Sequence, residues 1–180
     1  WVSGSNGTVG YSTNQGKSWT WVNPAGYEKF DFRDIHAFSN KEAVIINAGS
    51  PAVILRTTDA GKTWHKVYEN SHPEIFLDDL AFVGKQGYIL GDPIDGVFQL
   101  LKSTNKGKNW KDISNDYFLI ADSGEAAFAA SGSSMKMFKD KLYIGTGGKY
   151  ASFFNYNPIF CKPMFLTGGK QGEAQKKWQN

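Results

Sequence analysis

An eight-residue motif that occurs three times constrains the fold of this chain more than any other feature. Its pattern is Ser/Thr, any residue, Asp/Asn, any residue, Gly, Lys, any residue, Trp. The three copies end at Trp19, Trp64 and Trp110, which are 45 and 46 residues apart. Near-constant spacing of one motif indicates a repeat architecture, in which each repeat is one supersecondary unit that packs against its neighbours.

Each part of the octet suits a tight β-hairpin turn. The Asp/Asn side chain is expected to bond the backbone two residues on, and the Gly to take the positive φ that such a turn needs. The Ser/Thr hydroxyl can join the turn, and the Trp opens the next strand with a large apolar area. The residues predicted for this structural role are Ser12, Asn14, Gly16, Trp19, Thr57, Asp59, Gly61, Trp64, Ser103, Asn105, Gly107 and Trp110.

These octets resemble the Asp-box, or BNR repeat, of sialidases, of the sortilin luminal domain and of propellers like the photosystem II assembly factor. In those families the box joins the third and fourth strands of a propeller blade and lies on the outer rim. The resemblance implies an all-β fold, a β-propeller of four-stranded antiparallel blades. It implies no chemistry by itself, because one fold hosts many functions.

The strand patterns between the octets divide the chain into repeats. They predict a partial blade at 1–26, blades at 27–71 and 72–116, a fourth blade at 117–158 and an off-repeat tail at 159–180. The fourth blade is expected to begin with a strand at 125–130, and it lacks a complete octet. Since two blades are complete, we expect a truncated piece of a propeller of about six to eight blades. A closed four-bladed ring is the alternative.

Three segments carry a second resemblance. Residues 90–93, 124–132 and 147–149 are similar to a group of bacterial propellers that carry the label oxidoreductase. No nicotinamide or flavin motif supports that label here, and no cofactor is predicted. No metal site is predicted either, because His36, His65 and His72 have no ligand spacing. The Gly91–Gly96 segment lacks the carboxylate spacing of an EF-hand loop, so it is interpreted as a turn.

Composition and charge exclude several classes of function. The net charge is +3, and Arg33 and Arg56 are the arginines among 20 basic residues, which argues against nucleic-acid recognition. Lys102, Lys106, Lys108 and Lys111 surround the third octet, and we interpret them as a solvated hairpin tip rather than a phosphate-binding patch. Apolar runs are too short for a transmembrane helix. Cys161 is a single cysteine, which rules out an internal disulfide.

The candidate binding residues come from the predicted first strand of each blade, which lines the central channel of a propeller. Arg33, Asp34, Asp78, Asp79 and Glu125 are therefore expected near one another on a concave face. Carboxylates in this arrangement could hold a cation, a sugar or a basic peptide. The alternative is a wet, polar channel without a ligand.

The resemblance implies a non-catalytic scaffold that binds a protein partner or assists complex assembly, as in photosystem II assembly factor-like proteins. It also implies a compartment outside the cytoplasm, although the chain starts at Trp1 without a signal peptide. The alternative is a sialidase-like glycoside hydrolase with its site in the channel. That site needs three arginines and an Arg-Ile-Pro motif, so it is incomplete in this chain. No catalytic residue is predicted, and the oligomeric state stays open.

Overall fold

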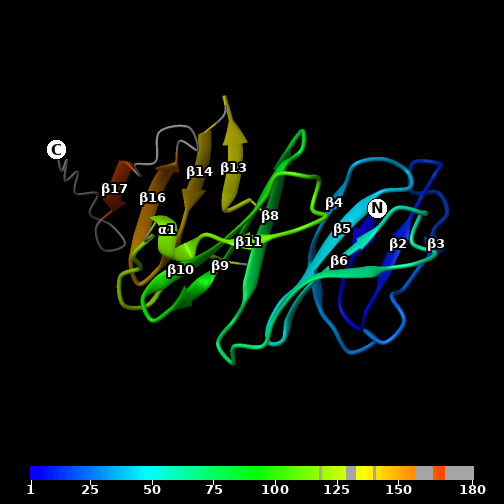
Figure 1. The fold of residues 1–180 in the computed structure, drawn as a ribbon, viewed down its shortest axis with the longest axis horizontal. Coiled ribbons are helices and arrows are strands. Elements are labelled where there is room, and N and C mark those ends of the chain that lie inside the picture. Colours follow the sequence, from blue (N-terminus) through cyan, green and yellow to red (C-terminus); the bar gives the residue numbers. More distant parts are fainter. Residues whose placement is uncertain (118, 129–132, 140, 157–163, 169–180) are drawn as a thin grey trace.

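Antiparallel sheets make up nearly all of the structure, a computed structural model that describes residues 1–117, 119–128, 133–139, 141–156 and 164–168. The sheets follow one another in chain order across the molecule, from the N-terminal sheet to the C-terminal one (Figure 1). The one described helix is the single turn α1 (Ser114–Tyr117). Among the described residues, no helix is long and apolar enough to cross a membrane.

The first three sheets are meanders in which consecutive strands pair. The first sheet holds β1 (Val2–Ser3), β2 (Val9–Tyr11) and β3 (Thr20–Trp21). The second holds β4 (Phe32–Ala37), β5 (Ala43–Asn47), β6 (Ala52–Thr57) and β7 (His65–Asn70). The third holds β8 (Leu77–Val83), β9 (Gln86–Ile94), β10 (Val97–Ser103) and β11 (Lys111–Asp112). The four-stranded antiparallel blade architecture expected from the octets is thus confirmed.

The fourth sheet differs from the expectation. It contains β13 (Met135–Phe138), β14 (Lys141–Gly145), β16 (Ala151–Tyr156) and β17 (Met164–Gly168). Its first strand is therefore β13 and not residues 125–128 of the segment expected at 125–130, whose residues 129 and 130 lie outside the described part of the chain. Its last strand lies inside the stretch expected to be off-repeat. Cys161 and the polar segment 171–180 lie outside the described residues.

The segment expected to open the fourth blade forms a small separate ladder. β12 (Glu125–Ala126) pairs with β15 (Gly147–Gly148). The strand stops there for two reasons. The Ala127 N–H bonds the Asp92 carboxylate at 2.8 Å instead of a neighbouring strand, and Phe128 has a φ of 60°. A positive φ is incompatible with extended backbone in a non-glycine residue.

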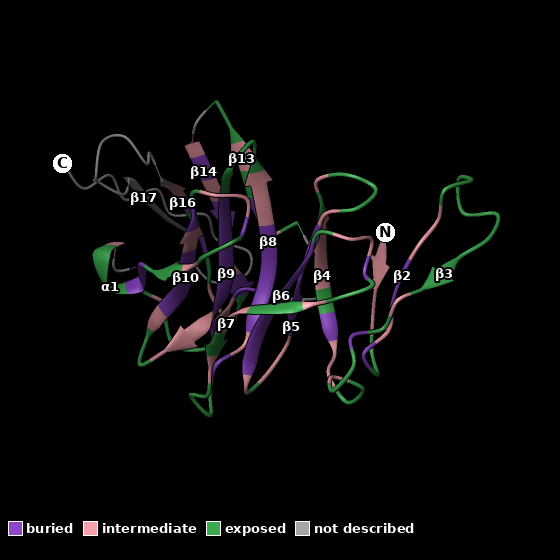
Figure 2. Ribbon diagram, turned by 45° about the vertical axis from the view of Figure 1, so that its right-hand side comes forward, coloured by how far each residue is buried: buried purple, intermediate pink, exposed green. Residues whose placement is uncertain are grey.

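Apolar side chains fill the three interfaces between successive sheets. Every residue of β5 and β6 is buried, which matches their nearly continuous Val, Ile and Leu runs. Continuous apolar strands are typical of sheets covered on both faces. Burial is concentrated in the middle strands and in β8, whereas β3, β11 and most turns are exposed (Figure 2). One cluster lies between the first and second sheets, one between the second and third, and one between the third and fourth.

The three octets form the same hydrogen-bonded turn. In the second copy, the Thr57 hydroxyl accepts the Gly61 N–H at 2.9 Å, and the Asp59 carboxylate accepts the Thr63 N–H at 2.9 Å. The first and third copies repeat both bonds at 2.8 to 3.0 Å. The Asp/Asn acceptor therefore reaches four residues on, where two were expected. The hydroxyl makes the shorter-range contact as well, at 3.3 Å to the Asp59 N–H.

The second octet also binds its sheet to the preceding one. The Trp64 indole N–H donates to the Val22 carbonyl at 2.9 Å, and a Cβ on Gly61 would lie 2.5 Å from the Val22 side chain. Gly61 has a φ of +77° as well. Gly16 has a similar φ of +82°, but a Cβ there would meet only an indole atom of Trp19, at 3.7 Å. Gly61 is thus constrained by backbone conformation and by packing, whereas Gly16 is constrained by conformation alone.

We predict that Gly61→Ala destabilises the full-length protein more than Gly16→Ala does. A positive φ costs an L-residue about 1–2 kcal/mol in both variants. Overpacking against Val22 adds about 1–3 kcal/mol only at Gly61. Urea unfolding of the two variants measures the difference in the free energy of unfolding. Equal losses at the two positions would contradict the tight contact between the second octet and the first sheet.

Candidate functional site

Two of the five residues expected to line the channel meet in the structure. Asp34 lies on β4 and Asp79 on β8, each at a register shift in the first strand of its sheet. The Asp34 carboxylate accepts the Leu80 N–H at 2.7 Å, and the Asp79 carboxylate accepts the Met135 N–H at 2.7 Å. Each carboxylate therefore bonds the backbone of the following sheet. Asp79 also accepts a hydrogen bond from the Ser134 hydroxyl at 3.0 Å.

This arrangement perturbs the ionisation of Asp34. Its pKa is raised to about 6, mainly by burial, with smaller contributions from the charge and hydrogen bonding of Asp79. The N–H bonds from Leu80 and Ile35 oppose the shift because they favour the carboxylate form. Asp34 can therefore hold a proton at mildly acidic pH, and the oxygens of both carboxylates already accept hydrogen bonds between sheets.

The other three expected residues lie elsewhere. Arg33 is exposed and pairs with Asp31 at 2.8 Å, and Asp78 is buried to 1% exposure beside the pair on β8. Glu125 lies on β12 instead of an innermost strand, so it does not join the pair. Its carboxylate accepts the Asp122 N–H at 2.9 Å and bonds the Thr146 hydroxyl. Within the described part of the chain, no group of three or more His, Cys, Asp or Glu residues is placed to hold a metal.

We predict that Asp34→Asn changes how stability depends on pH. The folded pKa of Asp34 lies above the ordinary value, so its stabilising effect is complete below pH ~4 and is lost as pH rises through ~6. Unfolding free energies measured from pH ~3 to ~7 should show the wild-type advantage over the variant falling by an amount on the order of 3 kcal/mol. The neighbouring His36 has a pKa lowered by burial, which affects both proteins alike.

Asp31→Asn is the control for the change in net charge, because it removes an exposed carboxylate three residues earlier in the chain. A difference between wild type and Asp34→Asn that stays flat over this range, or that grows with pH, would contradict the buried pair.

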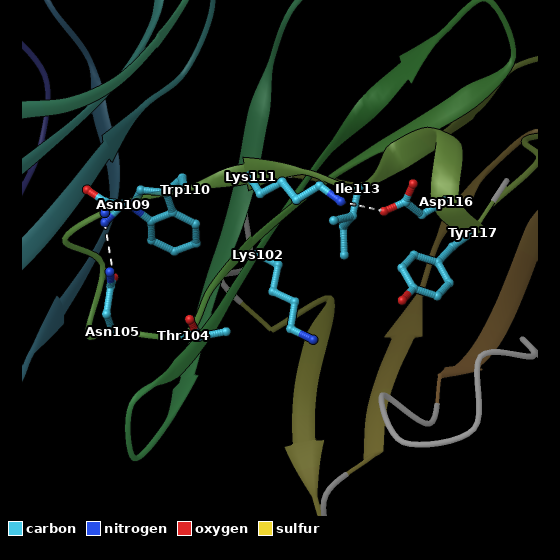
Figure 3. Close-up of a pocket in the computed structure, with 9 residues that line it drawn as sticks. All are labelled: Lys102, Thr104, Asn105, Asn109, Trp110, Lys111, Ile113, Asp116 and Tyr117. Carbon is cyan, nitrogen blue, oxygen red and sulfur yellow. Dashed lines mark hydrogen bonds and ion pairs between the residues drawn. The ribbon is translucent and has the colours of Figure 1, made fainter.

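Sequence reasoning missed a hollow of about 450 Å³ on the outer side of the third sheet (Figure 3). It is lined by Lys102 of β10, by the third octet, by β11 and by Tyr117 of α1. The Lys111 amine bonds the Asp116 carboxylate at 3.1 Å across one side. The Trp110 indole N–H is buried and has no partner among the described residues, whereas the matching Trp64 N–H bonds Val22. The sequence does contain a signal for this hollow, namely the aromatic and basic side chains on both sides of Asn115 and Asp116 in the chain.

The lining of this hollow suits binding more than catalysis. Trp110 and Tyr117 offer apolar ring surface, and Lys102, Asn105 and Asn109 offer hydrogen-bonding groups. Asp116 is the one carboxylate among the lining residues, and it is paired with Lys111. Glycoside hydrolysis ordinarily uses two carboxyl groups that flank the scissile bond. The hollow can therefore accept a polar, partly apolar segment, but its residues form no glycosidase pair.

Comparison with known proteins agrees with this architecture. Residues 1–72 match the model of a family described as photosynthesis system II assembly factor YCF48. No curated protein sequence matches the chain. The structure "YCF48 from Cyanidioschyzon merolae" is similar with a TM-score of 0.61 and 18% identity, over 96% of this chain and 53% of that one. The structure "YCF48 bound to D1 peptide" has a TM-score of 0.51 and 15% identity, over 93% and 63%.

A sialidase is similar at the same level. The K499G mutant of NanB sialidase from Streptococcus pneumoniae has a TM-score of 0.50 and 14% identity, over 96% of this chain and 27% of that one. The chain has the fold of a BNR-repeat β-propeller. The resemblance based on the three octets is confirmed. The chain spans about half to two thirds of the length of the two YCF48 structures.

Proposed function

We propose that this chain is part of a non-catalytic BNR propeller that binds a peptide segment of a protein partner and serves complex assembly. The match of residues 1–72 to the YCF48 family carries the proposal. The structure titled "YCF48 bound to D1 peptide" is a propeller of the same kind in contact with a peptide. For the present chain we infer the class of partner, a protein segment, and leave its identity to experiment.

The engagement of the charged residues supports a non-catalytic role. A sialidase clamps its substrate carboxylate with three arginines, and both arginines of this chain are already paired. Arg33 bonds Asp31, and Arg56 lies in the interface between the second and third sheets, where it bonds Glu42. The carboxylates of Asp34 and Asp79 likewise accept hydrogen bonds from N–H groups of the next sheet. The inter-sheet contacts of Asp34 and Asp79 contribute to folding, so these two carboxylates are poorly suited to catalysis on a substrate.

The hollow at the third sheet is our candidate for the peptide contact. It combines ring surface with amine and amide groups, as small-molecule and peptide sites commonly do. The likeness to NanB sialidase favours the alternative, a hydrolase of the glycosidase class, but at 14% identity it concerns the fold only. The two functions predict opposite results in a binding assay and a turnover assay.

We predict that the full-length protein, panned against a phage-displayed peptide library, selects a family of related peptides. The double variant Lys102→Ala/Tyr117→Ala should weaken the selected peptide by at least about tenfold, because a cation and a ring are lost from the hollow. Fluorescence anisotropy with the labelled peptide measures the change.

Lys17→Ala is the control, since it removes a lysine from the exposed tip of the first octet. A fluorogenic aryl sialoside incubated with the same protein should show no hydrolysis. Turnover of that substrate, together with failure to select any peptide family, would reject the scaffold and favour the hydrolase.

A further inference from the structure

We propose that a second hollow, between the second and third sheets, binds a phosphate dianion, either free or carried as a monoester. The hollow has a volume of about 400 Å³. It is lined by Arg56, Lys85, Lys106 and Lys108, with Glu42 as its one carboxylate. This site uses residues other than the inter-sheet carboxylates and does not rest on the peptide-binding function proposed above.

Arg56 forms the base of the hollow. Its side chain is buried, although it carries a full charge. The Nε group donates to the Lys106 carbonyl at 3.1 Å, and Nη2 donates to the Glu42 carboxylate at 3.2 Å. A guanidinium carries five N–H donors in a rigid fork, so the Nη1 group remains for a ligand. A buried arginine held by two hydrogen bonds is pre-organised to bind a planar or tetrahedral oxyanion.

The lysines give the hollow an excess of positive charge. The Lys106 amine lies 3.8 Å from Glu42 and 5.7 Å from the centre of the Phe38 ring. Lys85 and Lys108 form no ion pair with any described residue. Glu42 therefore compensates one of four cations. A phosphate dianion neutralises most of the remaining positive charge, whereas a ligand with a single carboxylate leaves more of that charge uncompensated.

The internal repeat supplies a direct comparison for this hollow. At the junction of the first and second sheets, Tyr11 stands in the place of Arg56 and Ala60 in the place of Lys106. The second and third octets make the same backbone contact, each within its own sheet. The Ala60 N–H bonds the Lys41 carbonyl at 3.0 Å, and the Lys106 N–H bonds the Lys85 carbonyl at 2.9 Å.

The scaffold of the turn therefore does not require the arginine or the fourth-position lysine. Of the two junctions compared, only the one between the second and third sheets has Arg56 and Lys106. The same turn forms at the other junction without them. Lys106 is also half-buried, beside Glu42 and Phe38, so it does not lie at a freely solvated hairpin tip. The added cations face the same hollow as Lys85 and Lys108, which is the arrangement that an anion site requires.

Isothermal titration calorimetry on the full-length protein, at about 0.1 M salt to screen diffuse attraction, tests the proposal. The probes are inorganic phosphate and a phosphoserine peptide with its unphosphorylated counterpart. Lys85→Gln/Lys108→Gln removes two exposed charges and keeps the Arg56 contacts. This variant should bind the phosphate group at least about tenfold more weakly, because two charge-assisted contacts are lost.

The matched control is Lys41→Gln/Lys62→Gln, which makes the same change in charge at the equivalent positions of the other junction. It should change affinity by less than about twofold, since surface charges away from the hollow contribute little. Tighter binding of the phosphopeptide than of inorganic phosphate assigns the site to a phosphorylated protein, and equal binding assigns it to free phosphate. No saturable binding, or equal weakening in both double variants, would overturn the proposal. So would tighter binding of an unrelated single-stranded oligonucleotide, which carries phosphodiesters.

Discussion

Face-to-face packing of successive sheets is the constraint on which the rest of this structure depends. The middle strands β5 and β6 are buried along their whole length, so neither face of the second sheet can be left uncovered. Polar groups caught in such an interface must find hydrogen-bond partners there, because an unmet bond costs about 1–3 kcal/mol. The contacts of Asp34 with Leu80 and of Trp64 with Val22 meet this requirement across two different interfaces.

The same requirement explains why several residues that look functional are structural. An aspartate on the first strand of a propeller blade is expected to face a channel, yet Asp34 and Asp79 point their oxygens at the next sheet. The register shift in β4 and in β8 places each carboxylate within reach of that backbone. Because a β-bulge re-aims a side chain, the inward direction cannot be read from simple alternation. The two carboxylates connect sheets, and burial in this interface, with a smaller contribution from Asp79, raises the pKa of Asp34.

The sequence predicted what depends on local chemistry. The octets predicted the turns, and short apolar runs predicted the strands of the second and third sheets, since both signals act over a few residues. The fourth sheet was misplaced because Glu125 opens a ladder that ends at the positive φ of Phe128. The pairing of Asp34 with Asp79 followed from their equivalent places in the repeat. The two hollows were not found, because they form where segments of different sheets meet and depend on tertiary packing.

Departures among the repeats are more informative than their agreement. The N–H groups of Ala60 and Lys106 make the same backbone bond, so the turn itself does not decide which side chain stands there. A repeat protein can therefore change charge at one junction while the backbone bonds within each sheet stay the same. Arg56 is an exception to this freedom, since its guanidinium bonds the Lys106 carbonyl and is buried. Burying a charge has a desolvation cost that Glu42 only partly offsets. Tyr11 stands in the matching place at the other junction, so this cost is not imposed by the fold. Because the fold does not require a buried arginine here, we explain its desolvation cost by a ligand that binds at this junction.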